Sequence, residues 1–134
     1  MPIDPAMIVA QARTWLGTPF QHQGRIKGHG VDCGGLLIGV GRELGLAVPE
    51  TPAYSMSPDP ALIADALARW CVAIRRVEMA PGDIGLFSFA GEPRHVGIFS
   101  DIGLIHAWAK PGGVVEHRLD DVWLHRLRGV WRIA

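Results

Sequence analysis

The chain has 134 residues, 49% of them hydrophobic and 19% charged, which is enough for one globular domain with a single core. Its 13 basic and 13 acidic residues give a formal net charge of +0, which argues against nucleic acid as a main partner. No apolar run is long enough to span a bilayer, and residues 1–5 lack the pattern of a signal peptide. We therefore expect synthesis in a cytoplasm and no membrane insertion.

The first half of the chain predicts three helices. Apolar spacing indicates one helix over 5–16, which Gly17-Thr18-Pro19 ends, a second over 33–44, and a third that begins after Asp59-Pro60. The polar and basic loop over 20–30 fits either a solvated linker or the rim of a substrate site. The segment 49–60 is rich in Pro, Ser and Thr and predicts an ordered surface loop.

The second half predicts strands. Short apolar segments alternate with Gly and Pro turns at 84–89, 95–100, 104–108, 114–118 and 130–133, with a short helical segment at 119–124. Helices followed by strands are typical of an α+β domain, in which N-terminal helices pack on one antiparallel β-sheet.

Cys33 stands at the start of the second predicted helix. Asp32 is a good N-cap residue, which places Cys33 in the first helical turn. A thiol there faces the positive end of the helix dipole and several unpaired N–H groups, and both favour the nucleophilic thiolate. Glycines within the helix let another element approach it closely. The alternative is that Cys33 is a small buried hydrophobic residue, as we expect for Cys71.

Two of the predicted strands carry one histidine each, His95 and His106. A turn at Ser100-Asp101 places them directly opposite each other, and a turn at Asp101-Ile102 makes them diagonal neighbours on one face. A three-residue loop would put them on opposite faces. The alternative role for either histidine is that of an ordinary core or edge residue.

A cysteine at a helix start, with two histidines on one sheet face, predicts nucleophilic catalysis. Cys33 would be the nucleophile, His95 the base that takes its proton, and His106 the group that fixes the tautomer of His95. The same three side chains are also a zinc ligand set, which would make the protein a metal-dependent amidase, although none lies in a short-spaced ligand pair. His117 and His125 are assigned to the surface.

Five short motifs resemble those of the NlpC-type cell-wall cysteine peptidases of bacteria and phages, which are papain-like domains. They are Gly17-Thr18-Pro19-Phe20, Val31-Asp32-Cys33-Gly34-Gly35-Leu36, Pro81-Gly82-Asp83-Ile84, His95-Val96-Gly97-Ile98 and His106-Ala107. They follow the family's order of lead-in, nucleophile motif, turn into the sheet, base strand and third polar residue. The His22-Gln23-Gly24 loop and the tail over 115–119 look most like the branch found in phage tails and gene-transfer particles.

The resemblance implies a single catalytic domain over 1–134, a cysteine endopeptidase that acts on peptidoglycan stem peptides without a cofactor or metal. It implies cleavage between D-glutamate and a diamino acid such as meso-diaminopimelate, through an acyl-enzyme on Cys33. Hub proteins of a phage tail or tail-like particle are the implied partners, and they would carry the protein to the cell wall. The residues expected to contact substrate are Phe20, His22, Arg25, Asp32, Gly34 and Arg94.

The sequence departs from the family's motifs at two positions. Phe20 stands where many relatives carry a tyrosine whose hydroxyl lies near the nucleophile, and Gly34 stands where a serine is usual. The single tyrosine, Tyr54, lies in another segment. These departures leave open a second function, that of a catalytically weak or inactive structural component of a tail with the same fold.

Overall fold

The computed structural model of the chain describes residues 3–51, 54, 59–89 and 92–134. Its helices are α1 (Pro5–Arg13), α2 (Cys33–Glu43), α3 (Pro60–Ala68) and α4 (Asp121–Arg126), with a 3₁₀ turn at Arg76–Glu78. Its strands are β1 (Arg25–Ile26), β2 (Gly30–Val31), β3 (Cys71–Ile74), β4 (Ile84–Phe89), β5 (Glu92–Phe99), β6 (Leu104–Trp108), β7 (Gly113–His117) and β8 (Leu127–Ile133). Apart from Tyr54, the middle of the predicted surface loop over 49–60 lies outside the described residues.

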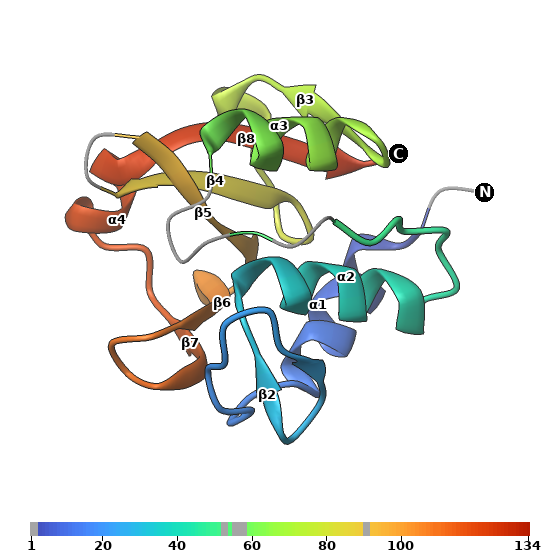
Figure 1. Ribbon diagram of the computed structural model, residues 1–134. Coiled ribbons are helices and arrows are strands. Elements are labelled where there is room, and N and C mark those ends of the chain that lie inside the picture. The colour runs from blue at the N-terminus through green and yellow to red at the C-terminus, as the bar shows by residue number, and fades with distance from the viewer. Residues whose placement is uncertain (1–2, 52–53, 55–58, 90–91) are drawn as a thin grey trace.

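Six strands form one antiparallel sheet in the order β3-β8-β4-β5-β6-β7 (Figure 1). Strands β4 to β7 follow one another as a meander, whereas β8, the last strand in the chain, lies between β3 and β4. β1 and β2 form a separate small sheet beside α2. The α+β architecture predicted from the sequence, with helices on one antiparallel sheet, is confirmed.

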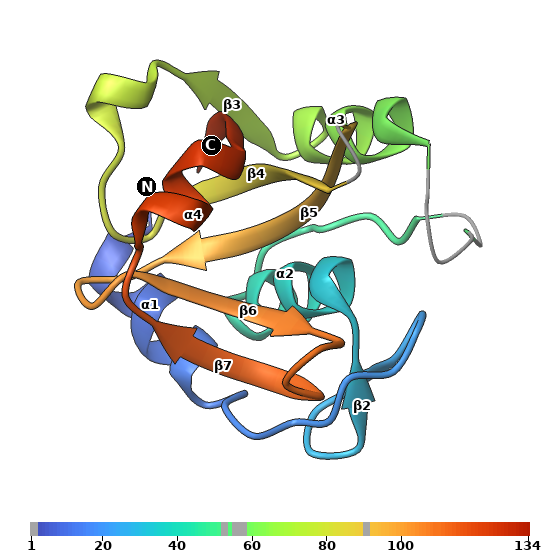
Figure 2. The same ribbon diagram turned by 90° about the vertical axis from the view of Figure 1, so that its left-hand side faces the viewer.

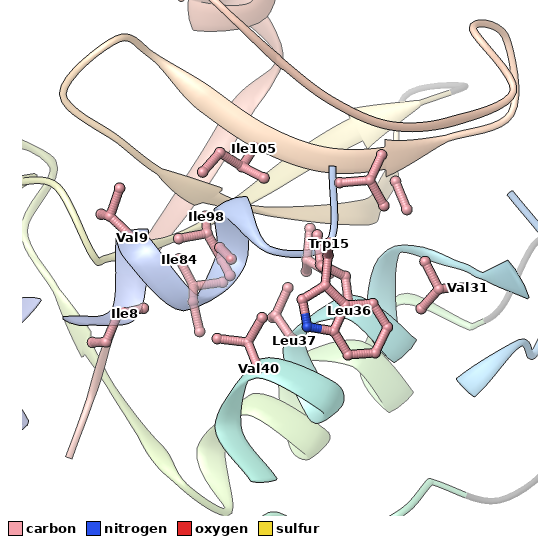
Figure 3. Close-up of a cluster of buried hydrophobic side chains, with 14 of the residues drawn as sticks. Ile8, Val9, Trp15, Val31, Leu36, Leu37, Val40, Ile84, Ile98 and Ile105 are labelled. Carbon is pink, nitrogen blue, oxygen red and sulfur yellow. The ribbon is translucent and has the colours of Figure 1, made fainter. Parts of the chain in front are cut away.

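Alternate side chains of the strands fill two hydrophobic clusters, one on each face of the sheet. α1 and α2 pack on the first face, where their apolar sides meet Ile84, Ile98 and Ile105 (Figure 3). The second cluster is largely aromatic, and Trp123 of α4 packs there against Phe87. The core therefore holds α2 firmly against β5 and β6.

α2 begins where the sequence predicts, because Asp32 caps it. The Asp32 carboxylate accepts a hydrogen bond from the backbone N–H of Gly35 at 2.8 Å. Close approach of another element is also confirmed, since a Cβ on Gly39 would lie 2.3 Å from the ring of Trp15. The cap and the close contact with Trp15 therefore hold α2 at one position relative to the rest of the protein.

The other predicted elements differ from the structure mainly at their ends. α1 stops at Arg13 rather than at 16, because the following amides bond to carbonyls three residues back and form a turn. β3 and the β1–β2 pair were not predicted, because they are short and carry no clear alternation of polar and apolar residues. None of the described helices is long and apolar enough to cross a membrane.

Candidate functional site

Cys33 is the first residue of α2 and is partly exposed. Its thiol lies beside the backbone of β5, where the amide of Val96 faces it, and beside its own amide and that of Gly34. β5 and β6 pair at two positions near their shared turn and separate beyond them (Figure 2). Cys33 therefore lies where the start of α2 meets the part of β5 that is not paired with β6.

Burial has the largest effect on the Cys33 thiol. Its pKa is raised to about 11, chiefly by removal from water and in smaller part by the Asp32 carboxylate, while the nearby backbone amides act in the opposite direction. From the sequence, the helix start is expected to favour the thiolate. The amides do act in that direction, but desolvation outweighs them. At neutral pH the resting side chain is therefore a thiol.

The turn between β5 and β6 determines how the two predicted histidines meet. Ile98 pairs with Ile105, which places the turn at Asp101-Ile102. His95 and His106 are therefore diagonal neighbours on one face, and the other two arrangements considered from the sequence are wrong. Nε2 of His95 lies 2.6 Å from Nδ1 of His106.

β7 brings a third histidine into the same group. Nε2 of His106 lies 2.8 Å from Nε2 of His117, and Nδ1 of His117 donates to the backbone carbonyl of Arg118 at 2.8 Å. His117, assigned to the surface from the sequence, is only partly exposed, because pairing with Leu104 puts its ring beside His106. His125 is exposed as predicted. We call His95, His106 and His117 the histidine row.

The histidine row is enclosed by aromatic side chains. The ring of Trp123 contacts all three imidazoles, with centroid separations of 5.9, 4.7 and 5.5 Å along the row. Burial, and to a smaller extent the positive charge of Arg126, lower the pKa of His95 to about 3. Burial and the neighbouring imidazoles lower the pKa of His106 to about 2. Both of these imidazoles are therefore neutral in the resting protein.

Tyr54 brings a hydroxyl to the start of α2 from a distant part of the sequence. The hydroxyl donates to the Asp32 carboxylate and accepts from Nη2 of Arg25 at 2.9 Å. In the sequence, Phe20 lacks a hydroxyl, and the single tyrosine, Tyr54, lies in another segment. The fold places that hydroxyl beside the residue that precedes Cys33, and nothing in the local sequence indicates this contact.

Three of the residues expected to contact substrate bind other parts of the protein. Arg25 forms ion pairs with Asp32 at 3.0 Å and Glu50 at 3.1 Å. Phe20 packs against the first hydrophobic cluster, and Nε2 of His22 donates to the backbone carbonyl of Tyr54 at 2.8 Å. The loop over 20–30 is thus ordered against the start of α2, and its interpretation as a solvated linker is wrong.

A cavity of about 180 Å³ opens beside Cys33, between α2, α3 and the described part of 49–54. Two further residues expected to contact substrate, Gly34 and Arg94, lie in its wall, as does Tyr54. Most of the remaining wall is apolar and includes Leu37, Ile38, Leu62, Ile63, Trp70 and Val96. The cavity therefore reaches the thiol along an apolar surface with a few polar groups.

The zinc site considered from the sequence has no support in this geometry. Among the residues that the structure describes, no group of three His, Cys, Asp or Glu side chains is arranged to hold a metal ion. His106 uses both ring nitrogens in hydrogen bonds to other histidines. Neither nitrogen is therefore directed at a point where a metal ion could also meet Cys33 and His95.

Comparison with known proteins shows which protein family the chain matches. The chain matches the NlpC/P60 family over residues 17–132. A NlpC/P60 family protein from Bacillus cereus is similar with a TM-score of 0.75 at 20% identity, over 99% of this chain and 41% of that one. No curated protein matches the sequence.

Two further solved structures have the same fold. The NlpC/p60 domain of the peptidoglycan hydrolase SagA gives a TM-score of 0.66 at 21% identity, over 98% of this chain and 99% of that domain. NlpC2 from Trichomonas vaginalis gives 0.70 at 20% identity, over 99% of this chain and 47% of that one. The chain thus spans less than half of the Bacillus cereus and Trichomonas vaginalis proteins and nearly all of the SagA domain.

Proposed function

The chain belongs to the NlpC/P60 family, and on this premise we propose that it is a cysteine peptidase that hydrolyses the stem peptides of peptidoglycan. The observation that carries the proposal is the Cys33 thiol at the start of α2, beside the strand that bears His95. His106 holds the second nitrogen of that imidazole at 2.6 Å. A thiol and a neutral imidazole are the groups that general-base catalysis requires.

In the proposed reaction Cys33 attacks the carbonyl carbon of the scissile bond while His95 takes the thiol proton on Nδ1. The carbonyl oxygen gains negative charge and meets the backbone N–H of Cys33. The C–N bond then breaks, and the leaving amine takes the proton from His95. Water that has given a proton to His95 hydrolyses the thioester, which releases the acid and restores the thiol.

We propose further that the bond cleaved joins D-glutamate to a diamino acid such as meso-diaminopimelate. The support is the resemblance of the five motifs to the NlpC-type peptidases, together with Arg94 in the wall of the cavity. A guanidinium there suits a substrate that carries carboxylates. Muropeptide products identified by mass spectrometry would name the bond directly.

The proposed place of action is the cell wall, reached as part of a phage tail or tail-like particle through contacts with hub proteins. The support is the likeness of the His22-Gln23-Gly24 loop and of 115–119 to the phage-tail branch. Mass spectrometry of purified particles from the source cells tests this part, since the chain should be present in them together with hub proteins.

The enzymatic part of the proposal is tested by digestion of purified sacculi. The wild-type protein should release muropeptides, and Cys33→Ala should release none while it keeps its melting temperature. Cys71→Ala is the matched control. Because Cys71 is buried in the first hydrophobic cluster, its substitution should leave the reaction unchanged. Full activity of Cys33→Ala would refute the mechanism.

An inactive or weak tail component of the same fold is the second candidate function. Phe20 and Gly34, which depart from the family's motifs, favour it, whereas the Tyr54 hydroxyl beside Asp32 counts against it. The sacculus assay separates the two, because such a component would release no more muropeptide than its Cys33→Ala variant.

A further inference from the structure

The histidine row ends on a backbone carbonyl, and that contact determines where its protons lie. Nδ1 of His117 lies 2.8 Å from the carbonyl oxygen of Arg118, which can only accept, so this nitrogen carries the proton. Neutral His117 therefore presents a lone pair at Nε2, 2.8 Å from Nε2 of His106. That nitrogen of His106 must donate, which leaves its Nδ1 to accept from Nε2–H of His95 at 2.6 Å.

One nitrogen of the row remains, Nδ1 of His95, and in this arrangement it carries a lone pair. The reverse arrangement would put a proton on that nitrogen and remove the one from Nδ1 of His117. A ring lone pair would then face the lone pairs of the Arg118 carbonyl at 2.8 Å, which is repulsive. The carbonyl therefore selects one of the two possible orders of protons along the row.

We propose that His117 is a positioning residue, which together with the Arg118 carbonyl sets the tautomers of His106 and His95 so that Nδ1 of His95 is the basic nitrogen. The inference rests on the proposed function, in which that nitrogen takes the proton of Cys33. His117 acts through His106 and is not among the residues that line the cavity.

Because the histidine row is largely buried, the contact between His117 and His106 affects the tautomers of the other rings. The side chain of His106 is fully buried, and Trp123 contacts all three rings, so a ring nitrogen that loses its partner cannot turn to bulk water. A buried donor or acceptor without a partner is costly, so a change at one end of the row passes to the next ring. His117 lies at the partly exposed end, where a substitution leaves both hydrophobic clusters intact.

Three variants of His117 change what is offered to Nε2 of His106. His117→Gln offers an amide oxygen as acceptor, His117→Leu offers neither donor nor acceptor, and His117→Lys offers a donor. The matched control is His125→Leu, on the exposed side of α4. Two measurements are made on each protein: the ¹⁵N shifts of the imidazole nitrogens without substrate, and kcat and KM on a stem peptide.

In the wild-type protein and in the control, His95 should be protonated on Nε2 and unprotonated on Nδ1. His117→Gln should keep that pattern and a kcat within a few-fold of wild type. His117→Lys should move the proton to Nδ1 and lower kcat by about 10²–10⁴-fold, the contribution of a general base, with little change in KM. The kcat of His117→Leu should lie between the values of these two variants.

A folded His117→Lys protein with wild-type kcat, or a wild-type His95 protonated on Nδ1, would overturn the inference. So would a His117→Gln protein as slow as His117→Leu, because a merely structural role would not distinguish them in that way. The ¹⁵N spectrum needs no substrate. If it shows the stated tautomers in a protein that leaves sacculi intact, the inference stands and the proposed function fails.

Discussion

At the scale of single residues, burial keeps the thiol of Cys33 and the imidazole of His95 uncharged. The same loss of water raises the pKa of Cys33 to about 11 and lowers that of His95 to about 3. The neutral thiol and the neutral imidazole are therefore the resting forms. In the proposed reaction, charge separates when the thiol attacks, at the place where the amides of Cys33 and Gly34 can meet the developing charge.

Alkylation by iodoacetamide reports this resting state. Cys33 should react faster than Cys71, because Cys33 is partly exposed and Cys71 is buried. The rate at Cys33 should rise about tenfold per pH unit from about pH 7 to 10, since the thiolate fraction does so below a pKa near 11. Mass spectrometry of the two peptides gives both rates. A plateau near neutral pH would mean that the resting group is already a thiolate.

The Tyr54 hydroxyl joins two charged groups, and its removal should be measurable. Tyr54→Phe leaves the Asp32 carboxylate with one partner fewer and should lower the free energy of unfolding by about 1–3 kcal/mol. Urea unfolding gives the value. Tyr54→Phe combined with Arg25→Leu serves as the control cycle, because the two losses should not add if the residues act as one cluster. Additive losses would contradict a shared role.

At the scale of secondary structure elements, the first turn of α2 contains two glycines in different surroundings. A Cβ on Gly35 would lie 2.3 Å from the carbonyl oxygen of Gly24 and 2.8 Å from the side chain of Val31. A Cβ on Gly34 would lie 3.9 Å from its nearest neighbours, which is ordinary contact. Gly35 is thus required by the packing of α2 on the loop over 20–30, and Gly34 is not.

The two glycines give a matched pair of variants. Gly34→Ala should leave the free energy of unfolding unchanged or raise it by up to about 1 kcal/mol, because alanine favours the helix. Gly35→Ala should lower it by about 1–3 kcal/mol, because the backbone of Gly24 cannot move away cheaply. Urea midpoints of the two proteins test this. Equal effects would show that the loop does not pack as closely as described.

The elements that the sequence predicts well are those with local signals. Asp32 marks the start of α2, and short apolar segments between Gly and Pro turns give the bounds of β4 and β6. The positions of His117 and Tyr54 depend instead on contacts between distant segments. The position of His117 follows from the register of β7 on β6. The position of Tyr54 follows from the contact between residue 54 and residue 32. No local periodicity encodes either one.

At the scale of the whole molecule, the buried histidines make stability depend on pH. Burial lowers their pKa from 6.5 to about 3 for His95 and about 2 for His106. Below about pH 6.5 the unfolded chain therefore binds protons that the folded chain does not. The free energy of unfolding is then highest above that pH and decreases as the pH falls through 6.5 toward 3.

Urea unfolding at a series of pH values tests this dependence. Between about pH 6.5 and 5 the slope should approach roughly 2.7 kcal/mol per pH unit, which corresponds to two protons. Carboxyl groups whose pKa is lowered, such as that of Glu116 beside Arg13, change the free energy of unfolding below about pH 4.5, which is outside this window. His95→Asn should show about half the wild-type slope. A flat wild-type profile would mean that the histidines are hydrated.

The position of β8 inside the sheet constrains the order in which the molecule can assemble. The meander β4–β7 has short connections and can form by local pairing, whereas β3 pairs with β8 among the described strands. That pairing closes a loop across almost half of the chain, from Cys71 to Ile133, and such closures cost entropy and slow folding. During refolding the histidine row can therefore form before β3 pairs with β8 and before α3 completes the wall of the cavity. Native-like histidine contacts and the complete cavity beside Cys33 would then appear at different times.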